Sequence, residues 1–431
     1  MNTIARVNIW NEMVGAVAWD EAKGFATFEF DESFLNKNLD LAPLKMPVSE
    51  AKNGKRIFSF PNLNHETYKG LPGLLADSLP DRFGNRLIDI WLARQGRSSD
   101  SFNPVERLCY IGKRGMGALE FEPILAPFDQ TSAHLELNEL VKLAKKILDE
   151  KYNFKTNLSK KNENVLLDIV RIGTSAGGAR AKAIIAYNPK NQDVRSGQID
   201  NLNDYEYWIL KFDGVNDRKL GDPLGYGRIE YAYYLMAKEC GIKMSECKLL
   251  LDDKYAHFMT KRFDRPDNNK LHLQTLCAIA HFDYNYPASY SYEQAFQVLR
   301  QLKLSYENTD QLFLRMIFNV IARNQDDHTK NISFLMDKKG NWSLSPAYDV
   351  TFAYDPKNKW MKSHQMSING KFDEITRDDI ISLARNMNIK KAGQKIDKAV
   401  DVISGWKNFA KEAKVTAEQT KYIQSTLLLN I

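Results

Sequence analysis

One ordered run of residues near the end of the chain constrains the fold most: an apolar helix, a polar loop, a hairpin and then an isolated acid. The helix reads LFLRMIFNVIARN and is apolar nearly all round, which is typical of a helix buried on every side. The loop QDDHTKN follows it, and the segments ISFLMD and WSLS, joined by KKGN, predict a two-stranded hairpin. The segment PAYDV then brings Asp349 back toward the loop.

Protein kinases have their catalytic residues in this order. Their catalytic loop places a base aspartate five residues before an asparagine, and a second metal-binding aspartate lies beyond a hairpin. Asp326 and Asn331 have that spacing, and Asp349 has the later position. Asp326 is therefore the candidate base, and Asn331 and Asp349 are candidate magnesium ligands, since a hard cation prefers oxygen donors. The alternative is a polar turn with solvated charges, because one D-x-x-x-x-N match means little by itself.

Two further loop residues are candidate contacts of ATP. His328 has no second His or Cys at zinc-ligand spacing, so a role in bonding the backbone or orienting the loop is favoured. Lys330 either contacts the γ-phosphate or faces solvent. Phe263, in the segment FMTKRFDRP between the two expected lobes, either covers an adenine ring or belongs to the core.

A kinase also needs a phosphate-binding turn and a lysine on a strand, and the chain has both upstream. Lys211 lies in the apolar strand YWILKF, where its charge needs a partner or a route to water. Glu230, which opens the next helix, is a candidate partner. The turn TSAGGARAK supplies backbone N–H groups that an anion can approach, although a plain connecting turn fits it equally well. Its candidate ATP-binding residues are Ser175, Ala176, Gly177, Gly178, Ala179, Arg180, Ala181 and Lys182.

Other segments predict the surrounding elements. Residues 4–31 alternate apolar and polar side chains in three stretches, which indicates a small antiparallel sheet. Asp81 can cap a helix that runs to about Arg94, and Thr376 with Asp379 is spaced as a capping box for the first helix of the tail. The turn GKRGMGAL resembles a phosphate loop, but its distance from the other motifs favours a structural turn.

Composition sets wide limits. With 431 residues, the chain is too long for one simple core. The net charge of +6 permits an anionic partner without requiring one. Its four cysteines lack CxxC spacing, which argues against a zinc site or a disulfide framework and fits a reducing cytoplasm. We expect no signal peptide and no membrane partner, because no apolar run approaches membrane-spanning length.

Taken together, these motifs resemble the HipA family of bacterial serine/threonine kinases, the toxins of type II toxin–antitoxin systems. The resemblance covers nearly the whole chain and rests on YIGKRGMGALEFEP, TSAGGARAKAIIA, YWILKF, RIEYAYYLMAKECGI, KRFDR, NQDDHTKNISF and LSPAYDV, in the family's order. It implies an α+β, protein-kinase-like fold with two lobes. The expected parts are a small β-rich N-terminal subdomain at 1–125, a kinase N-lobe at 126–263 and a mostly helical C-lobe at 264–431.

The resemblance also implies an activity and partners. Asp326 would be the base, Asn331 and Asp349 would hold Mg²⁺, and Lys211 would contact ATP phosphate. Ser175 matches the family's autophosphorylated serine, whose phosphate ejects the phosphate loop. Family members act on aminoacyl-tRNA synthetases or other translation proteins, and they bind a HipB-like helix-turn-helix antitoxin through which they reach DNA.

Two other functions fit the same sequence. The first is a co-repressor with a vestigial kinase site that acts through DNA or an antitoxin. The many lysines of the tail would contribute to DNA binding, although a solvated helix face explains those lysines more simply. The second is a lipid or small-molecule kinase on the same fold. The full set of acids argues against a vestigial site, because nothing structural requires all of them.

Overall fold

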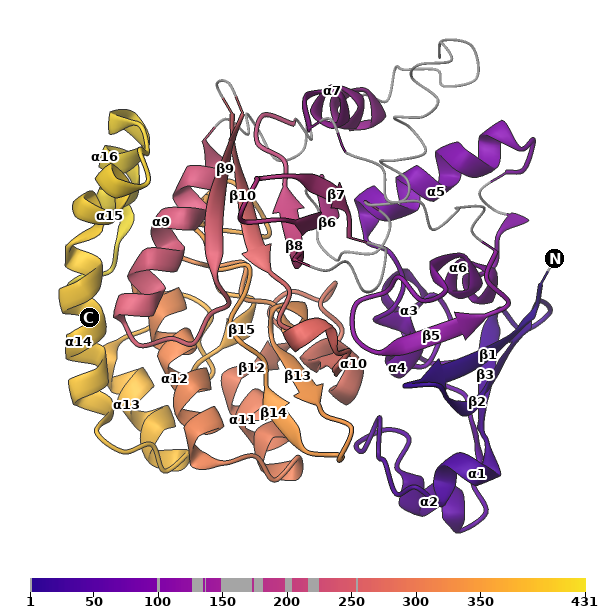
Figure 1. The fold of residues 1–431 in the computed structure, drawn as a ribbon. Coiled ribbons are helices and arrows are strands. Elements are labelled where there is room, and N and C mark those ends of the chain that lie inside the picture. The colour runs from indigo at the N-terminus through magenta and orange to yellow at the C-terminus, as the bar shows by residue number, and fades with distance from the viewer. Residues whose placement is uncertain are drawn as a thin grey trace.

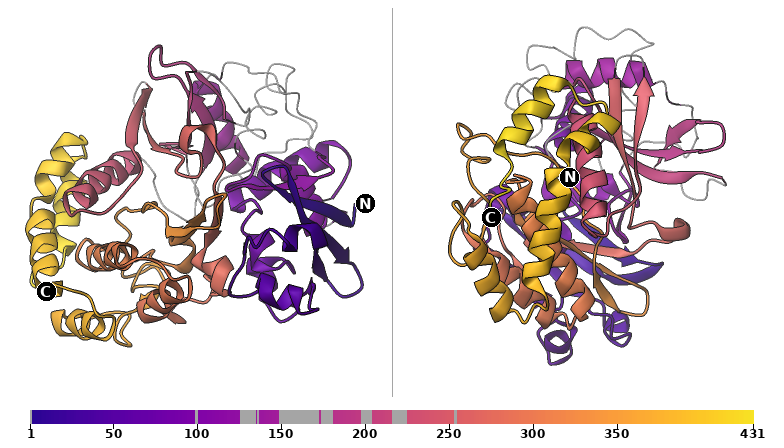
Figure 2. Two further views of the ribbon diagram at one scale, coloured as in Figure 1. Left: turned by 60° about the horizontal axis from the view of Figure 1, so that its bottom comes forward. Right: turned by 90° about the vertical axis from the view of Figure 1, so that its left-hand side faces the viewer.

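The structure is a computed structural model that describes residues 2–98, 101–125, 135, 137–148, 173, 181–197, 204–215, 225–252 and 255–431. Two five-stranded sheets and a large group of helices form its main parts (Figure 1). The chain begins at one end of the molecule and finishes at the other, as the left view of Figure 2 shows. None of the helices in these ranges is both long and apolar enough to cross a bilayer.

The first sheet is antiparallel throughout and has the strand order β4-β3-β2-β1-β5. Its three long strands confirm the prediction for residues 4–31, because alternate side chains point into a buried core while the others face outward. The strands are β1 (Ile4–Ile9), β2 (Glu12–Asp20), β3 (Phe25–Phe30), β4 (Ile57–Phe58) and β5 (Leu119–Glu122).

Short helices surround this sheet, and the longer α5 (Arg82–Arg94) packs in the core beneath the second sheet. The short helices are α1 (Glu32–Leu35), α2 (Val48–Lys52), α3 (His65–Tyr68), α4 (Gly73–Ala76) and α6 (Pro104–Ile111). The predicted cap of α5 is confirmed, since the Asp81 side chain accepts a hydrogen bond from Gly84 N.

The second sheet is antiparallel and has the order β7-β6-β8-β10-β9. Its strands are β6 (Lys182–Tyr187), β7 (Val194–Ser196), β8 (Glu206–Lys211), β9 (Cys247–Asp252) and β10 (Tyr255–Lys261). Helix α9 (Tyr226–Glu239) packs on β9 and β10, and α7 (Leu137–Leu148) lies near α5. The core beneath this sheet also takes in residues of α5 and α6, so the first two parts of the chain share one set of apolar contacts.

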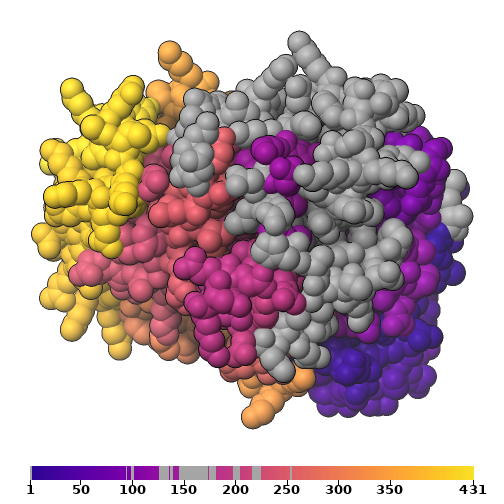
Figure 3. All heavy atoms as spheres, turned by 45° about the horizontal axis from the view of Figure 1, so that its top comes forward, coloured from indigo at the N-terminus to yellow at the C-terminus, as the bar shows by residue number. Residues whose placement is uncertain are grey.

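The remaining third of the chain is mostly helical. Its elements are η2 (Pro266–Asn268), β11 (His272–Thr275), α10 (Leu276–Ala280), β12 (Tyr290–Ser291), α11 (Tyr292–Gln301), α12 (Tyr306–Ile321), η3 (Thr329–Asn331), β13 (Ser333–Met336), β14 (Trp342–Leu344), β15 (Met366–Ser367), α13 (Arg377–Asn386), α14 (Ala392–Ser404), α15 (Trp406–Glu412) and α16 (Ala417–Thr426). The capping box at Thr376 and Asp379 is present and begins α13 as predicted. In the space-filling view, the C-terminal helices form one end of the molecule and the N-terminal part the other (Figure 3).

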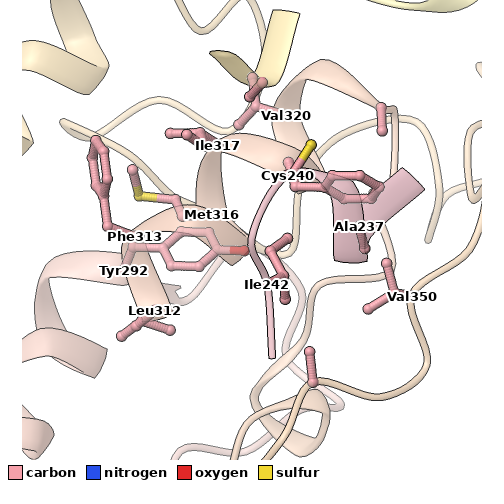
Figure 4. Close-up of a cluster of buried hydrophobic side chains, with 14 of the residues drawn as sticks. Ala237, Cys240, Ile242, Tyr292, Leu312, Phe313, Met316, Ile317, Val320 and Val350 are labelled. Carbon is pink, nitrogen blue, oxygen red and sulfur yellow. The ribbon is translucent and has the colours of Figure 1, made fainter. Parts of the chain in front are cut away.

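Helix α12 lies at the centre of this helical part, as its all-round apolar pattern predicts. Figure 4 shows its side chains Phe313, Met316, Ile317 and Val320 packed among residues of neighbouring segments, including Tyr292 of α11. All of these side chains are buried. A helix enclosed on every side provides a fixed base for the loop that leaves its C-terminus.

The predicted hairpin after α12 is also present, with β13 paired to β14 and to β11 in an antiparallel sheet. The alternation of Ile332, Phe334 and Met336 predicts that only one face of this strand is covered. In the structure, however, all four β13 residues are buried. Phe334 belongs to the core of the helical part, whereas Met336 belongs to the core of the N-terminal sheet. These two side chains share one face of the strand, so that face passes from one core to the other, and Ser333 and Leu335 on the opposite face are buried as well.

Candidate active site

Lys211 lies at the end of β8, between two carboxylates. Its ammonium Nζ is 2.6 Å from Oε1 of Glu230 and contacts a carboxylate oxygen of Asp349. Glu230 lies in the first turns of α9, so the strand, the helix and the residue after the hairpin meet at one point. The predicted partnership of Lys211 and Glu230 is confirmed.

These three charges stabilise one another's ionised forms. Burial by itself lowers the pKa of Lys211, but the carboxylates of Asp349 and Glu230 outweigh it and hold that pKa above its ordinary value. Burial likewise raises the pKa of Asp349, and Lys211, with help from Lys182, more than reverses the effect and holds it well below the usual range. The site therefore contains a charged lysine and a charged aspartate at neutral pH.

The backbone at Asp349 is itself unusual. Its φ of 55° lies in the left-handed region, which residues with a Cβ seldom adopt. Such conformations persist where surrounding contacts fix them, and they are concentrated at functional sites. Here the conformation aims the carboxylate at Lys211.

The loop after α12 holds Asp326 and Asn331 together. The Asn331 side-chain nitrogen Nδ2 donates to the backbone carbonyl of Asp326 over 2.7 Å, which closes the loop and leaves the amide oxygen of Asn331 for other partners. The Asp326 side chain is 50% exposed, and its Oδ1 lies 3.7 Å from Nε2 of His328. A carboxylate in this position is accessible to a substrate hydroxyl from outside.

The neighbouring acid, Asp327, has a different environment. It is buried and accepts three hydrogen bonds: from the Tyr292 hydroxyl at 2.8 Å, from His364 Nδ1 at 2.9 Å and from Gln365 N at 2.7 Å. It fixes the loop to α11 and to the segment before β15. The five-residue spacing selects Asp326 and gives no indication of a role for Asp327, so the sequence did not reveal this anchor.

The next residues of the loop contact the segment after α10 and, through Lys330, the N-terminal part. Thr329 is buried, and its hydroxyl donates to the carbonyl of Phe282 over 2.6 Å. The ammonium of Lys330 lies 4.8 Å from the centre of the Tyr284 ring and lines a crevice together with Asp77 of the segment after α4. Lys330 is therefore engaged on the side of the loop that faces the N-terminal part.

Two of the predicted phosphate-loop residues are described, and both are buried. Ala181 accepts a hydrogen bond from Phe212 N over 3.1 Å, and Lys182 begins β6 directly opposite Lys211 on β8. Lys182 is thereby brought beside the cluster of Lys211, Glu230 and Asp349. Ser175, Ala176, Gly177, Gly178, Ala179 and Arg180 lie outside the described residues.

Phe263 follows β10, where the two lobes join. Its ring lies 5.6 Å from that of Tyr348, the residue before Asp349, and the Tyr348 hydroxyl donates to the carbonyl of Lys330. Beside it, the buried carboxylate of Asp264 pairs with Arg262 and Arg265 and accepts from Gly117 N over 2.8 Å. The turn GKRGMGAL is thus held against the hinge, and its structural interpretation is confirmed.

The residues fit a hard divalent cation. Asn331, Asp349 and His328 line one cavity, and the side chains of the first two contain the oxygen donors that such an ion prefers. Among the described residues, no group of three or more His, Cys, Asp and Glu side chains could hold a metal ion by itself. Asn331 and Asp349 would hold magnesium here, provided that Asp349 is shared between the ion and Lys211.

Comparisons with known proteins agree on one family. The family model for the HipA N-terminal domain matches residues 5–122, and that for the HipA-like C-terminal domain matches residues 174–420. A search of curated protein sequences gives no match. The C-terminal match contains Lys182, Lys211 and the whole loop that follows α12.

Two solved structures are similar to the chain. One is HipA of Shewanella oneidensis MR-1, in a complex with HipB and its operator DNA, with 16% identity and a TM-score of 0.68 over 98% of this chain and 94% of that one. The other is the proinflammatory kinase CtkA of Helicobacter pylori, with 12% identity and a TM-score of 0.31 over 52% of this chain and 91% of that one. The first similarity confirms the HipA-like, kinase-like fold with two lobes. Since a single family model spans more than half of its length, this chain belongs to the HipA family.

Proposed function

We propose that the chain is an ATP- and magnesium-dependent serine/threonine protein kinase and the toxin of a toxin–antitoxin pair. The observation that carries the proposal is the contact of Lys211 with both Glu230 and Asp349, beside a loop that exposes Asp326. The three expected parts, at 1–125, 126–263 and 264–431, remain the proposed division of the chain.

The side chains have distinct roles in the proposed transfer. Lys211 and Lys182 bind phosphate oxygens of ATP, and Glu230 keeps Lys211 extended along its strand. Magnesium, held by Asn331 and Asp349, would neutralise charge on the phosphates. Asp326 takes the proton of the acceptor hydroxyl as its oxygen bonds to the γ-phosphorus and the bond to the bridging oxygen breaks, so that ADP leaves with the electron pair.

Two features support a regulated toxin. Ser175 precedes the glycines of the phosphate loop, and a phosphate there would add about two negative charges to a segment that has to bind anions. The Shewanella HipA was solved with HipB and operator DNA, so a HipB-like antitoxin is the proposed partner, with DNA reached through it. The proposed substrate is a translation protein such as an aminoacyl-tRNA synthetase.

The proposal is tested by self-labelling. Incubation of the purified chain with [γ-³²P]ATP and Mg²⁺ should place label on serine, which mass spectrometry should map to Ser175. Asp326→Asn should reduce the rate about 100-fold or more, because a general base contributes on the order of 10²–10⁴-fold. Asp373→Asn, the same change at an exposed surface acid, is the control and should label normally.

Equal labelling in the Asp326→Asn protein would remove Asp326 as the base. Salt-dependent DNA binding by the isolated chain, together with no nucleotide binding, would instead favour the alternative of a co-repressor with a vestigial kinase site.

A further inference from the structure

An acidic segment of the N-terminal part lies against the candidate site. Residues 77–81 connect α4 to α5 and contain two aspartates. Asp77 accepts hydrogen bonds from the Thr275 backbone N at 2.6 Å and from its hydroxyl at 2.9 Å, which fixes the segment to the start of α10. The segment thereby occupies a fixed position next to the loop that carries Lys330.

Asp81 reaches the opposite side of the site. Its Oδ2 lies 3.4 Å from Nζ of Lys182, and the two side chains are 6% and 3% exposed. Its other oxygen, Oδ1, accepts from Gly84 N over 2.7 Å as the cap of α5. Because one oxygen is held by the helix terminus, the direction in which the second oxygen faces Lys182 is fixed.

Lys182 needs such a partner because of its neighbour. Lys182 and Lys211 are direct cross-strand partners on β6 and β8, so their side chains emerge on the same face of the sheet. Two like charges side by side repel, and burial increases that repulsion. Glu230 and Asp349 compensate Lys211, and Asp81 is in ion-pair contact with Lys182.

We propose that Asp81 is a positioning residue for nucleotide, which holds Lys182 toward the ATP phosphates as Glu230 holds Lys211, so that the N-terminal domain forms part of the ATP site. This inference rests on the proposed kinase function. It gives the kinase two lysine–carboxylate pairs, one within the N-lobe and one between domains.

The energetics of burial favour this role. Burial lowers the pKa of Lys182, and Asp81 is the largest opposing influence on it. Without that carboxylate, the buried amine gives up its proton more readily, and a neutral amine attracts phosphate weakly. Loss of Asp81 should therefore weaken ATP binding more than it slows the transfer step.

A double-mutant cycle on the full-length chain tests the proposal. Asp81→Asn keeps the helix cap, since asparagine also accepts from the N–H of a first turn, and removes the charge. We expect its KM for ATP to rise about tenfold, as for the loss of one charge-assisted hydrogen bond, with kcat within about threefold of the wild type. In a Lys182→Met background, the same substitution should change KM by less than about twofold, because its target is gone.

Two further comparisons separate positioning from folding. Asp81→Glu and Asp81→Gln have the same length and differ in charge, so the Glu variant should have the lower KM even if Asp81→Asn does not fold. Asp31→Asn removes the charge from another helix-capping aspartate of the same domain, at the surface, and should leave KM unchanged.

Each result has one interpretation. An unchanged KM in Asp81→Asn, an effect that persists undiminished with Lys182→Met, or equal KM values for the Glu and Gln variants would overturn the positioning role while leaving the kinase intact. A wild-type chain that neither binds nor hydrolyses ATP would overturn the kinase proposal, and this inference with it.

Discussion

Two adjacent aspartates at the end of α12 have opposite surroundings. Asp326 is half-exposed, and its backbone carbonyl rather than its carboxylate is used to close the loop. Asp327 is buried beneath it with three donors on its carboxylate. The loop therefore leaves one acid accessible from outside and uses the other as a structural anchor.

This contrast predicts that two isosteric variants differ in how much folding stability they lose. Asp327→Asn should lower the free energy of unfolding by about 2–3 kcal/mol, because an amide cannot accept from all three donors and leaves at least one of them unpaired. Asp326→Asn should change it by less than about 0.5 kcal/mol, since its side chain is largely solvated. Urea unfolding followed by circular dichroism measures both, and a stable Asp327→Asn protein would contradict the anchoring role.

At the residue scale, the sequence identified those candidate site residues that are marked by their spacing along the chain. The interval of five residues selected Asp326 and Asn331, and the position after the hairpin selected Asp349. It also paired Lys211 with Glu230. It recognised Asp81 only as a helix cap, because nothing in a linear sequence shows that the second oxygen of that carboxylate faces a lysine about 100 residues later.

At the scale of elements, the N-terminal part contacts the helical part through the packing of α4 on α10. Gly73, at the start of α4, lies so close to α10 that an added Cβ would be 2.4 Å from the carbonyl oxygen of Ala278 and 2.7 Å from the His281 ring. The backbone conformation there is ordinary, so the requirement for glycine is one of space.

Gly73→Ala should therefore destabilise the protein by about 1–3 kcal/mol, the usual cost of overpacking a close contact. Gly393→Ala, in the first turn of α14, is the matched control. Its Cβ would meet only an Arg377 side-chain nitrogen at 3.6 Å, so the substitution should stabilise the protein by about 0.4–1 kcal/mol. Chemical denaturation should give opposite signs for the two variants, and a shared sign would contradict this account of the interface.

The elements that sequence reasoning identified are those with a clear period. Alternation located β1, β2 and β3, and the apolar surface of α12 located the buried helix. Strand β9 had no such signal. It lies at the edge of its sheet and has mostly half-buried residues on both faces, so the segment CKLLLD does not alternate.

At the scale of the whole molecule, two histidines, the buried His272 and the partly buried His281, lie where the N-terminal part meets the helical part. His272 Nε2 donates to the carbonyl of Leu41 over 3.0 Å, and burial lowers its pKa to about 4. His281 Nε2 accepts from Gly73 N over 3.3 Å, and burial, with the nearby charge of Lys45, lowers its pKa to about 3. Both rings are neutral in the folded protein at pH 7.

These shifts predict that acid weakens the folded state. The unfolded rings titrate near pH 6.5, so their contribution to stability is complete above that value and declines as the pH falls toward 4, by at most about 1.4 kcal/mol per pH unit for each ring. The temperature at the midpoint of thermal unfolding should therefore decrease as the pH is lowered from 6.5 to 5. Asp81, whose pKa burial raises to about 6, opposes this trend in the same window.

Variants isolate the effect of the histidines. A double variant His272→Phe, His281→Phe should have a flatter pH dependence than the wild type, because the two titrating rings are gone. His65→Phe, at an exposed histidine of α3, should retain the full dependence. If the unfolding midpoint of the double variant depends on pH as steeply as that of the wild type, other groups cause the acid sensitivity.

The hairpin strand β13 has a consequence for how the protein is made. Met336 and Cys277 complete the apolar cluster whose other members lie at residues 5–121. A ribosome delivers those first residues long before it reaches the hairpin, so the N-terminal sheet emerges with two of its core positions empty. The growing chain must keep that apolar surface from other proteins until Cys277, the loop after α12 and strand β13 have been synthesised, because only then can the first core be completed.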